Sequence, residues 1–205
     1  LWLAFVAAAT VILIIPGPTI ILVASYAMAH GRKVALSIAA GVALGDLVAM
    51  SASLLGLGAL VLASAQLFTL LKWIGAGYLV FLGVKLWRSA AHVTIEDLPI
   101  KKNVTPGGLF THAFVVTALN PKSIAFFIAF VPQFLRPAAP LLPQFAVLIA
   151  TFVTLATLNA LAYALLADRL RTRIAQPGVL RGITRAGGGV LIGLGVLTAA
   201  TRRAA

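Results

Sequence analysis

The chain has 205 residues, of which 61% are hydrophobic and 10% are charged. Because a water-soluble domain carries about 25% charged residues, this composition excludes an ordinary soluble domain, and the lack of cysteine excludes disulfides, thiolate metal sites and dithiol redox chemistry. The net charge of +12 indicates basic loops at an anionic membrane surface, and nucleic-acid binding is not expected because no basic face is interleaved with stacking aromatic residues.

Long apolar segments alternate with short polar breaks along the chain. The first uncharged run, 1–29, has no basic n-region, and its 29 residues exceed the roughly 7 to 15 of a signal-peptide core, so it is predicted to be a membrane span. A span needs about 20 apolar residues. The predicted spans, taken in chain order, are 3–29, 35–63, 67–87, 109–135, 141–167 and 183–201.

Basic residues are unequally distributed between the two sides of these spans. The loops after the first, third and fifth spans contain 11 Lys and Arg residues, whereas the opposite side contains 4. Lys and Arg concentrate in cytoplasmic loops. The sequence therefore predicts that both termini lie outside the cytoplasm.

Two glycine-rich segments indicate an internal repeat. Glycines 75, 77 and 83 of the third span recur 112 positions later, in the sixth span, as glycines 187, 189 and 195. Glycine-rich segments are common in packed membrane helices, so chance similarity is the alternative to shared ancestry. Asp46 in the second span and Asn159 in the fifth lie 113 positions apart, at nearly the same offset.

The first span of each half contains a helix-breaking motif. These motifs are Pro16-Gly17-Pro18-Thr19 in the first span and Asn120-Pro121-Lys122-Ser123 in the fourth. Proline removes a backbone donor and clashes with the preceding turn. Each of these spans is therefore predicted to be a broken helix.

Three spans in each half make the halves cross the membrane in opposite directions. The predicted fold is an all-α membrane protein of six transmembrane helices, arranged as two inverted three-helix repeats with broken first helices. It forms a single transmembrane domain, 1–205, with repeat one at about 1–88, a cytoplasmic linker at about 89–108 and repeat two at about 109–203. In many secondary transporters built from inverted repeats, the broken helices meet near the bilayer midplane. The two breaks are therefore expected to meet there, related by a pseudo-twofold axis in the membrane plane.

Two ionisable residues, Asp46 and Lys122, lie deep within predicted spans, where a charge costs about 2.5–3.5 kcal/mol. Asp46 is either a structural carboxylate, satisfied by Lys122 or by free amides of a broken helix, or a group that binds protons or a substrate ammonium. Lys122 either adds charge to an anion site, pairs with Asp46 or extends to the membrane surface.

The second span is expected to pack along one face and to line a cavity along another. Ser37, Gly41 and Gly45 recur every four residues, a stripe of small residues that lets a neighbouring helix approach closely. Asp46 points off this seam, and Ser53 shares its face. The alternative is ordinary helix packing with no site beside it.

Thr19 and Ser123 each begin the helical segment after a break and are expected to act as N-caps. Free N–H groups at such helix starts attract anions, so one of them would suit the carboxylate of an amino acid. No HExxH, GxSxG or clustered metal ligands occur in the sequence. An enzyme, a metal site and a cofactor are therefore not expected.

These motifs together resemble the LysE/RhtB family of amino-acid exporters, over nearly the whole chain and in the expected order. The segments that carry the resemblance are Pro16–Pro18, His30–Lys33, Gly41–Asp46, Lys72–Gly83 and Asn120–Lys122. The resemblance implies export of lysine, arginine, homoserine, threonine, leucine or related compounds across a bacterial inner membrane, driven by the proton motive force. One departure is Thr19-Ile20, where many members have polar residues such as Asp-Asn, which makes export of basic substrates less secure.

The main hypothesis is a proton-coupled exporter with alternating access, multi-pass in the inner membrane with periplasmic termini. The alternative is a membrane-assembly or lipid-interacting protein that transports nothing. The expected partners are the lipid bilayer, an amino-acid substrate and protons, and a homodimer is an open alternative to a monomer. The predicted substrate or proton pathway consists of Pro16, Gly17, Pro18, Thr19, Asp46, Ser53, Asn120, Pro121, Lys122, Ser123 and Asn159.

Overall fold

A computed structural model describes residues 2–15, 17–63, 65–89, 105–136, 139–166 and 177–200. Within these ranges the regular structure is entirely helical. The helices are α1 (Trp2–Ile14), α2 (Pro18–His30), η1 (Arg32–Val34), α3 (Ala35–Ala63), α4 (Ala65–Ser89), α5 (Pro106–Ala118), α6 (Pro121–Ala129), η3 (Val131–Phe134), α7 (Leu141–Leu165) and α9 (Pro177–Ala200).

Both predicted broken helices are present. Helices α1 and α2 form a pair bent by 54°, and α5 and α6 form a second pair bent by 42°. By length and composition, Arg32–Ala59 and Leu141–Leu165 can each cross a membrane, which makes four spans when each bent pair counts as one. Helices α4 and α9 coincide with the third and sixth predicted spans, but in the described part of the chain they are not among the helices found long and apolar enough to cross a membrane. The count of six spans therefore stays a prediction.

Proline in the first turn explains why two helices begin earlier than expected. The fourth span was expected from residue 109, but α5 begins at Pro106, because Thr105 accepts a hydrogen bond from the Gly108 N–H at 3.1 Å and proline suits the first turn. Helix α9 begins at Pro177 rather than near residue 183. Proline favours this position as well.

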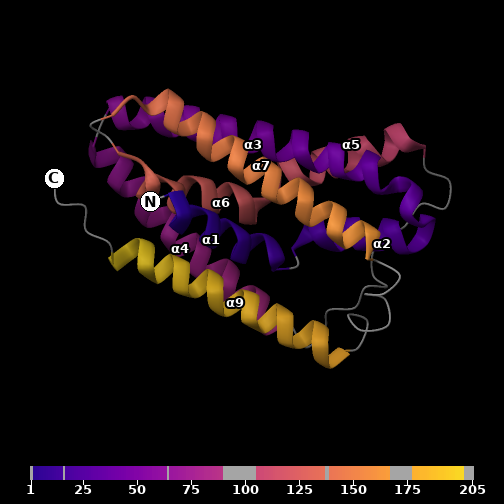
Figure 1. Cartoon of the computed structure of the whole chain (residues 1–205). Coiled ribbons are helices and arrows are strands. Elements are labelled where there is room, and N and C mark those ends of the chain that lie inside the picture. Colours follow the sequence, from indigo (N-terminus) through magenta and orange to yellow (C-terminus); the bar gives the residue numbers. More distant parts are fainter. Residues whose placement is uncertain are drawn as a thin grey trace.

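The bent pairs lie in the middle of the molecule and run in opposite directions (Figure 1). From the N-terminus, α1 leads to the centre and α2 continues to the far end, whereas α5 starts at that far end and α6 returns (Figure 1). Helices α3 and α7 lie together on one side, and α4 and α9 on the other. Both breaks are thus held near the centre, between two pairs of longer helices.

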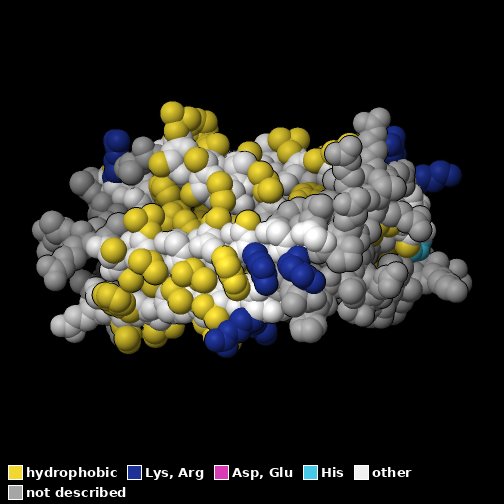
Figure 2. All heavy atoms as spheres, turned by 90° about the horizontal axis from the view of Figure 1, so that it is seen from below, with side chains coloured by type: hydrophobic (Ala, Val, Ile, Leu, Met, Phe, Trp, Pro, Cys, Tyr) yellow, Lys and Arg dark blue, Asp and Glu magenta, His cyan; other side chains and the backbone are white. Residues whose placement is uncertain are grey.

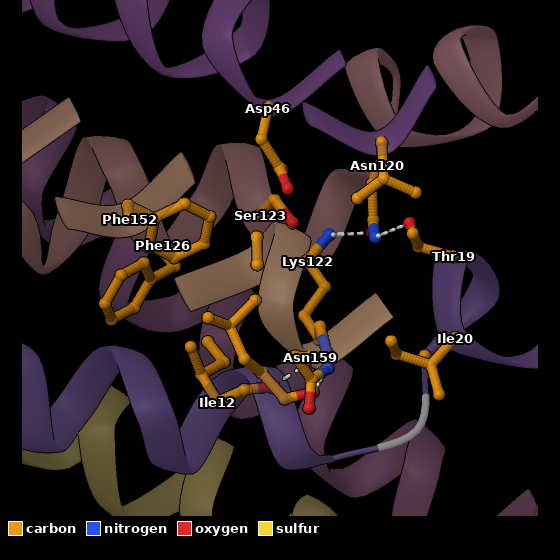
Figure 3. A pocket seen from close by; sticks show the side chains of 14 residues that line it. Ile12, Thr19, Ile20, Asp46, Asn120, Lys122, Ser123, Phe126, Phe152 and Asn159 are labelled. Carbon is orange, nitrogen blue, oxygen red and sulfur yellow. Dashed lines mark hydrogen bonds between the residues drawn. The ribbon is translucent and has the colours of Figure 1, made fainter. Parts of the chain in front are cut away.

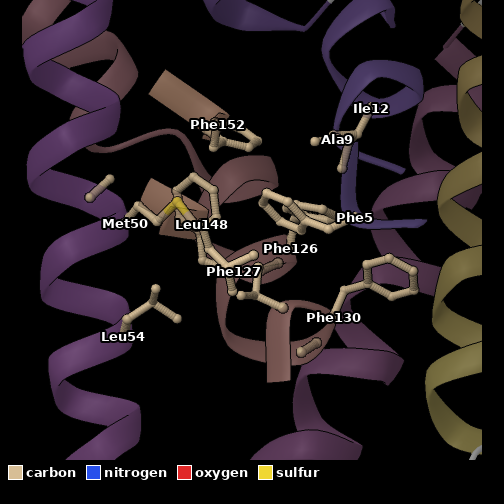
Figure 4. Close-up of a cluster of buried hydrophobic side chains, with 14 of the residues drawn as sticks. Phe5, Ala9, Ile12, Met50, Leu54, Phe126, Phe127, Phe130, Leu148 and Phe152 are labelled. Carbon is tan, nitrogen blue, oxygen red and sulfur yellow. The ribbon is translucent and has the colours of Figure 1, made fainter. Parts of the chain in front are cut away.

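Two apolar clusters flank the breaks. The first joins α1, α3, α4, α6, α7 and α9 and is rich in phenylalanine (Figure 4). The ring centroids of Phe127 and Phe152 lie 4.8 Å apart in an edge-to-face contact. The second joins α2, α3, α5 and α7 and includes Tyr26, whose hydroxyl lies 2.9 Å from Nδ1 of His112. The centre of the molecule is therefore closed by packed side chains toward both of its ends.

The outer surface is strongly apolar. Large side chains that a soluble protein would bury are exposed, with Leu36 at 76%, Leu3 at 74% and Leu142 at 72%. Hydrophobic side chains are spread over much of the described surface in Figure 2, where the Lys and Arg side chains form small groups. Contiguous apolar patches of this extent suit contact with lipid.

The predicted small-residue seam on α3 is confirmed at Gly41 and Gly45. A Cβ added to Gly45 would lie 2.7 Å from the Cβ of Thr117 and 2.8 Å from the Phe114 carbonyl, and Gly41 similarly meets the Phe110 carbonyl. A side chain larger than hydrogen at either position would push α3 and α5 apart. The seam thereby sets how closely α3, which carries Asp46, approaches the second broken pair.

Glycines also join α4 to α9. A Cβ on Gly83 would meet the Gly188 carbonyl at 2.6 Å and Ile192, while one on Gly195 would meet the Ala76 carbonyl at 2.7 Å and Val80. Shifting each residue by 112 positions converts the first set of contacts into the second. The sequence repeat therefore has a counterpart in the packing of these two helices.

Candidate functional site

The two breaks lie against each other, as expected from the sequence. The Thr19 hydroxyl accepts hydrogen bonds from Asn120 Nδ2 at 3.1 Å and from the Thr117 hydroxyl at 3.4 Å. These bonds join the start of α2 to the junction of α5 and α6. Their placement at the membrane midplane and their relation by a pseudo-twofold axis stay predictions.

The expected capping residues were wrong. Helix α2 has Gly17 as its N-cap and α6 has Asn120, because Pro18 and Pro121 occupy the first helical positions and start each helix earlier than assumed. Asn120 accepts a hydrogen bond from the Lys122 N–H at 3.0 Å. Gly17 offers no side-chain cap, so the start of α2 carries less intrinsic capping than the start of α6.

A small cavity separates the ends of the broken helices (Figure 3). Its volume is about 30 Å³, which is room for about two water molecules. An amino acid does not fit without movement of the lining side chains. The lining combines polar and apolar groups from both halves of the chain: Ile12, Leu13, Gly17, Thr19, Ile20, Val42, Asp46, Asn120, Lys122, Ser123, Phe126, Phe152, Ala156 and Asn159.

Lys122 binds the end of α1. Its ammonium donates to the carbonyls of Ile12 at 3.1 Å and Ile15 at 3.0 Å. The last carbonyls of a helix have no partner within the helix and carry the negative end of its dipole, so a cation is favourable there. The lysine stem crosses Gly17, where an added Cβ would lie 3.1 Å from Nζ and 3.2 Å from Cε.

Two residues of α7 bind the two carbonyls that lie between those of Ile12 and Ile15. Asn159 Nδ2 donates to Leu13 at 3.0 Å, and the Tyr163 hydroxyl donates to Ile14 at 3.0 Å. Residues four apart lie on the same face of a helix, so one face of α7 supplies both donors. Together with Lys122, they satisfy four consecutive carbonyls at the break.

Asp46 is the acidic group of the cavity. It is 3% exposed and projects from α3. In Figure 3 its carboxylate points toward Ser123 and the start of α6, whereas the Lys122 side chain runs the other way, toward Ile12 and Asn159. Among the described residues the Asp46 carboxylate makes no hydrogen bond or ion pair, so the alternative of a carboxylate neutralised by direct pairing with Lys122 gains no support.

The structure gathers most of the predicted pathway around this cavity. The residues it brings together are Gly17, Thr19, Asp46, Asn120, Lys122, Ser123 and Asn159. Pro18 and Pro121 start the adjoining helices instead of lining the cavity, and Pro16 lies outside the described residues. Ser53, about two turns along α3 from Asp46, is half-buried and does not line this cavity.

Sequence reasoning missed Tyr163 and the apolar wall of the cavity. Tyr163 follows Asn159 by four residues, and that spacing was the available signal. The wall includes Val42, Phe126 and Phe152. These residues could not be told from ordinary core residues, because nothing in the local pattern distinguishes an apolar side chain at a cavity from one in a packed interior.

A helical protein with lipid-compatible spans and a polar cavity between two broken helices has the features of a membrane transporter. The family model of the LysE type translocator matches residues 10–202, and the chain belongs to this family.

Curated relatives agree with that assignment. A homoserine/homoserine lactone efflux protein of Salmonella typhimurium is 32% identical over 203 residues, 99% of this chain and 98% of the relative. An uncharacterized membrane protein of Vibrio cholerae is 34% identical over 98% of this chain and 97% of its own length. A leucine efflux protein of Salmonella choleraesuis is 31% identical over 66% of this chain and 64% of its own length. No solved structure matches the chain.

Proposed function

We propose that this chain is a secondary active exporter that carries small amino acids, or closely related amino compounds, out of the bacterial cytoplasm. The observation that carries the proposal is the meeting of the two breaks around one polar cavity. The names of the relatives, which are efflux proteins for homoserine, homoserine lactone and leucine, supply the first compounds to test.

The cavity offers complementary charge for a zwitterion. The end of α1 presents carbonyl oxygens, which suit an ammonium group, and Asp46 adds a buried carboxylate. The starts of α2 and α6 present N–H groups, which suit a carboxylate. Opposite helix ends on opposite walls can therefore orient an amino acid.

Alternating access is supported by the arrangement of the closed centre. Apolar clusters seal the cavity toward both ends of the molecule, as in an occluded transporter. Transport then requires one cluster at a time to open. The matching glycine contacts of α4 and α9 support two inverted repeats, six spans in all.

Proton coupling would depend on Asp46. No other acidic residue occurs within the predicted spans, and Asp46 lies in the cavity that we assign to the substrate. In this scheme protons enter from the periplasm as substrate leaves, in a chain whose two termini are periplasmic. The pathway residues are those that line the cavity, with the helix starts at Pro18 and Pro121 positioning them.

The proposal is tested by exchange of labelled homoserine and leucine in liposomes that contain the purified protein. Ala156 lines the cavity and is buried, whereas Thr154 lies on the exposed face of the same helix. We expect Ala156→Leu to abolish exchange, because the added volume exceeds the cavity, while Thr154→Leu retains it. Exchange that survives in both variants would place the pathway elsewhere, and no exchange in the wild type would favour the membrane-assembly alternative.

A further inference from the structure

A cation from the second half of the chain occupies the end of α1. The Lys122 ammonium lies 3.1 Å and 3.0 Å from the carbonyl oxygens of Ile12 and Ile15. A primary ammonium has three N–H donors, and the two carbonyls satisfy two of them. The geometry suits any –NH3⁺ group, and Lys122 is the one that the chain itself provides.

The cavity beside this contact is too small for the proposed substrates. Its volume of about 30 Å³ holds about two water molecules, so a bound amino acid must take space that a side chain now fills. The Lys122 stem crosses from α6 over Gly17 to α1. A flexible four-carbon stem can leave this position without displacement of a helix.

A buried carboxyl group lies on another wall of the same cavity. Asp46 is 3% exposed and, among the described residues, makes no hydrogen bond or ion pair. A buried carboxylate without a partner is costly, so a cation that leaves α1 gains by turning toward Asp46. That movement exchanges the two carbonyl contacts of Lys122 for an ion pair with Asp46.

We propose that Lys122 is a tethered occupant of an ammonium site, and that the primary amino group of the transported molecule displaces it from the carbonyls of Ile12 and Ile15. Lys122 then turns toward Asp46 and frees the volume for the substrate. The identity of the displacing molecule as a transported substrate rests on the proposed function, whereas the existence of the ammonium site does not. The substrate class is thereby narrowed to compounds with a free primary amino group, which excludes N-acylated amino acids.

Removing the side chain and supplying its missing part tests the site directly. Lys122→Ala lacks a three-carbon ammonium, which n-propylammonium replaces. We expect the thermal unfolding midpoint of the purified variant to fall by several degrees below wild type. Added n-propylammonium chloride should restore most of this loss, and the effect should saturate with concentration. Unfolding is followed by the fluorescence of the 3 Trp residues.

Three controls make the result specific. Tetramethylammonium chloride carries the charge without N–H donors, and 1-propanol has the length without the charge, so neither should restore Lys122→Ala. Lys122→Met keeps the stem and should not respond to n-propylammonium. The same shift with tetramethylammonium, or no saturable shift with n-propylammonium, would overturn the proposal.

A second measurement uses wild type and decides the matter if Lys122→Ala does not fold. In protein labelled with 15N-lysine, the Nζ resonance of Lys122, assigned by its absence from Lys122→Met, should shift with leucine or homoserine and stay unchanged with N-acetylleucine. An unchanged resonance would contradict displacement. If liposomes exchange amino acids but neither the unfolding midpoint of Lys122→Ala nor the Lys122 signal of wild type responds, the ammonium site is contradicted and the proposed function is retained. If n-propylammonium restores Lys122→Ala but no substrate is exchanged, the ammonium site stands and the function falls.

Discussion

Asp46 is the single residue on which the coupling mechanism depends most. Asp46→Asn keeps the shape of the side chain but cannot titrate. We expect the variant to lose transport driven by a pH gradient while substrate counterflow, which needs no net proton movement, survives at least in part. Both activities can be measured in the same liposome preparation.

The stability of this variant separates a mechanistic role from a structural one. Lys122 already binds two carbonyls of α1 and makes no ion pair with Asp46, so we expect Asp46→Asn to insert and fold like wild type. A structural pair would instead lose about 3–5 kcal/mol when one partner is removed. Asp168→Asn, outside the predicted spans, is the matched control. Full pH-driven export by Asp46→Asn would remove Asp46 from the mechanism.

Gly17 is expected to tolerate no side chain. A Cβ there would lie 3.1 Å from Lys122 Nζ and 3.2 Å from Cε, so Gly17→Ala should push the ammonium from its carbonyl partners. Crowding of this kind costs about 1–3 kcal/mol, and transport should fall with it. Gly56→Ala is the control, because a Cβ at Gly56 meets nothing within 4 Å. Equal unfolding midpoints for the two variants would show that Lys122 adapts freely.

At the level of single residues, the sequence predicted which groups gather but not what they bind. The glycine and prolines of the breaks, with Asp46, Lys122 and Asn159, were identifiable because such residues are rare inside membrane spans. Their partners were not identifiable. Lys122 reaches Ile15 across 107 positions, and Tyr163 reaches Ile14 across 149, and contacts at that separation depend on how whole helices pack.

The packing of α4 against α9 allows a test of the repeat at the scale of elements. Gly83 and Gly195 make matching contacts with the partner helix, because a Cβ added to either would lie within 2.8 Å of a carbonyl oxygen. We expect Gly83→Ala and Gly195→Ala to lower the unfolding midpoint by similar amounts, since both force the same two helices apart. The measurement is thermal unfolding of each purified variant.

Gly77→Ala is the matched control for these two variants. It lies on α4, but an added Cβ would meet nothing within 4 Å, and replacement of glycine by alanine within a helix favours the fold by about 0.5–1 kcal/mol. We therefore expect no loss of stability. A large loss for one of Gly83 and Gly195 with none for the other would argue against equivalent packing.

Helix boundaries followed from the sequence wherever a local signal was strong. Proline placed the breaks correctly, because its effect on a helix does not depend on distant partners. The starts of α5 and α9 were placed too late, since hydropathy marks where apolar residues begin, whereas Pro106 and Pro177 start the helices before that point. A helix can extend beyond the apolar part of a span.

The orientation of the whole molecule can be tested without first removing native thiols, because the chain contains no cysteine. We expect Ala139→Cys to react with a membrane-impermeant maleimide in intact cells, since the link between η3 and α7 is predicted to be periplasmic. Lys33→Cys, on the predicted cytoplasmic side, should react only after lysis. The reverse pattern would invert the topology derived from the 11-to-4 distribution of basic residues.

The close packing at the centre of the molecule determines whether protons can leak through this protein. A membrane potential acts on every ion that finds a route through, with about 2.3 kcal/mol per elementary charge at 100 mV. A void of about 30 Å³, with apolar clusters toward both ends, interrupts any file of water along which protons could pass. Idle copies should therefore act as insulators, and cells could hold many of them without dissipating respiration.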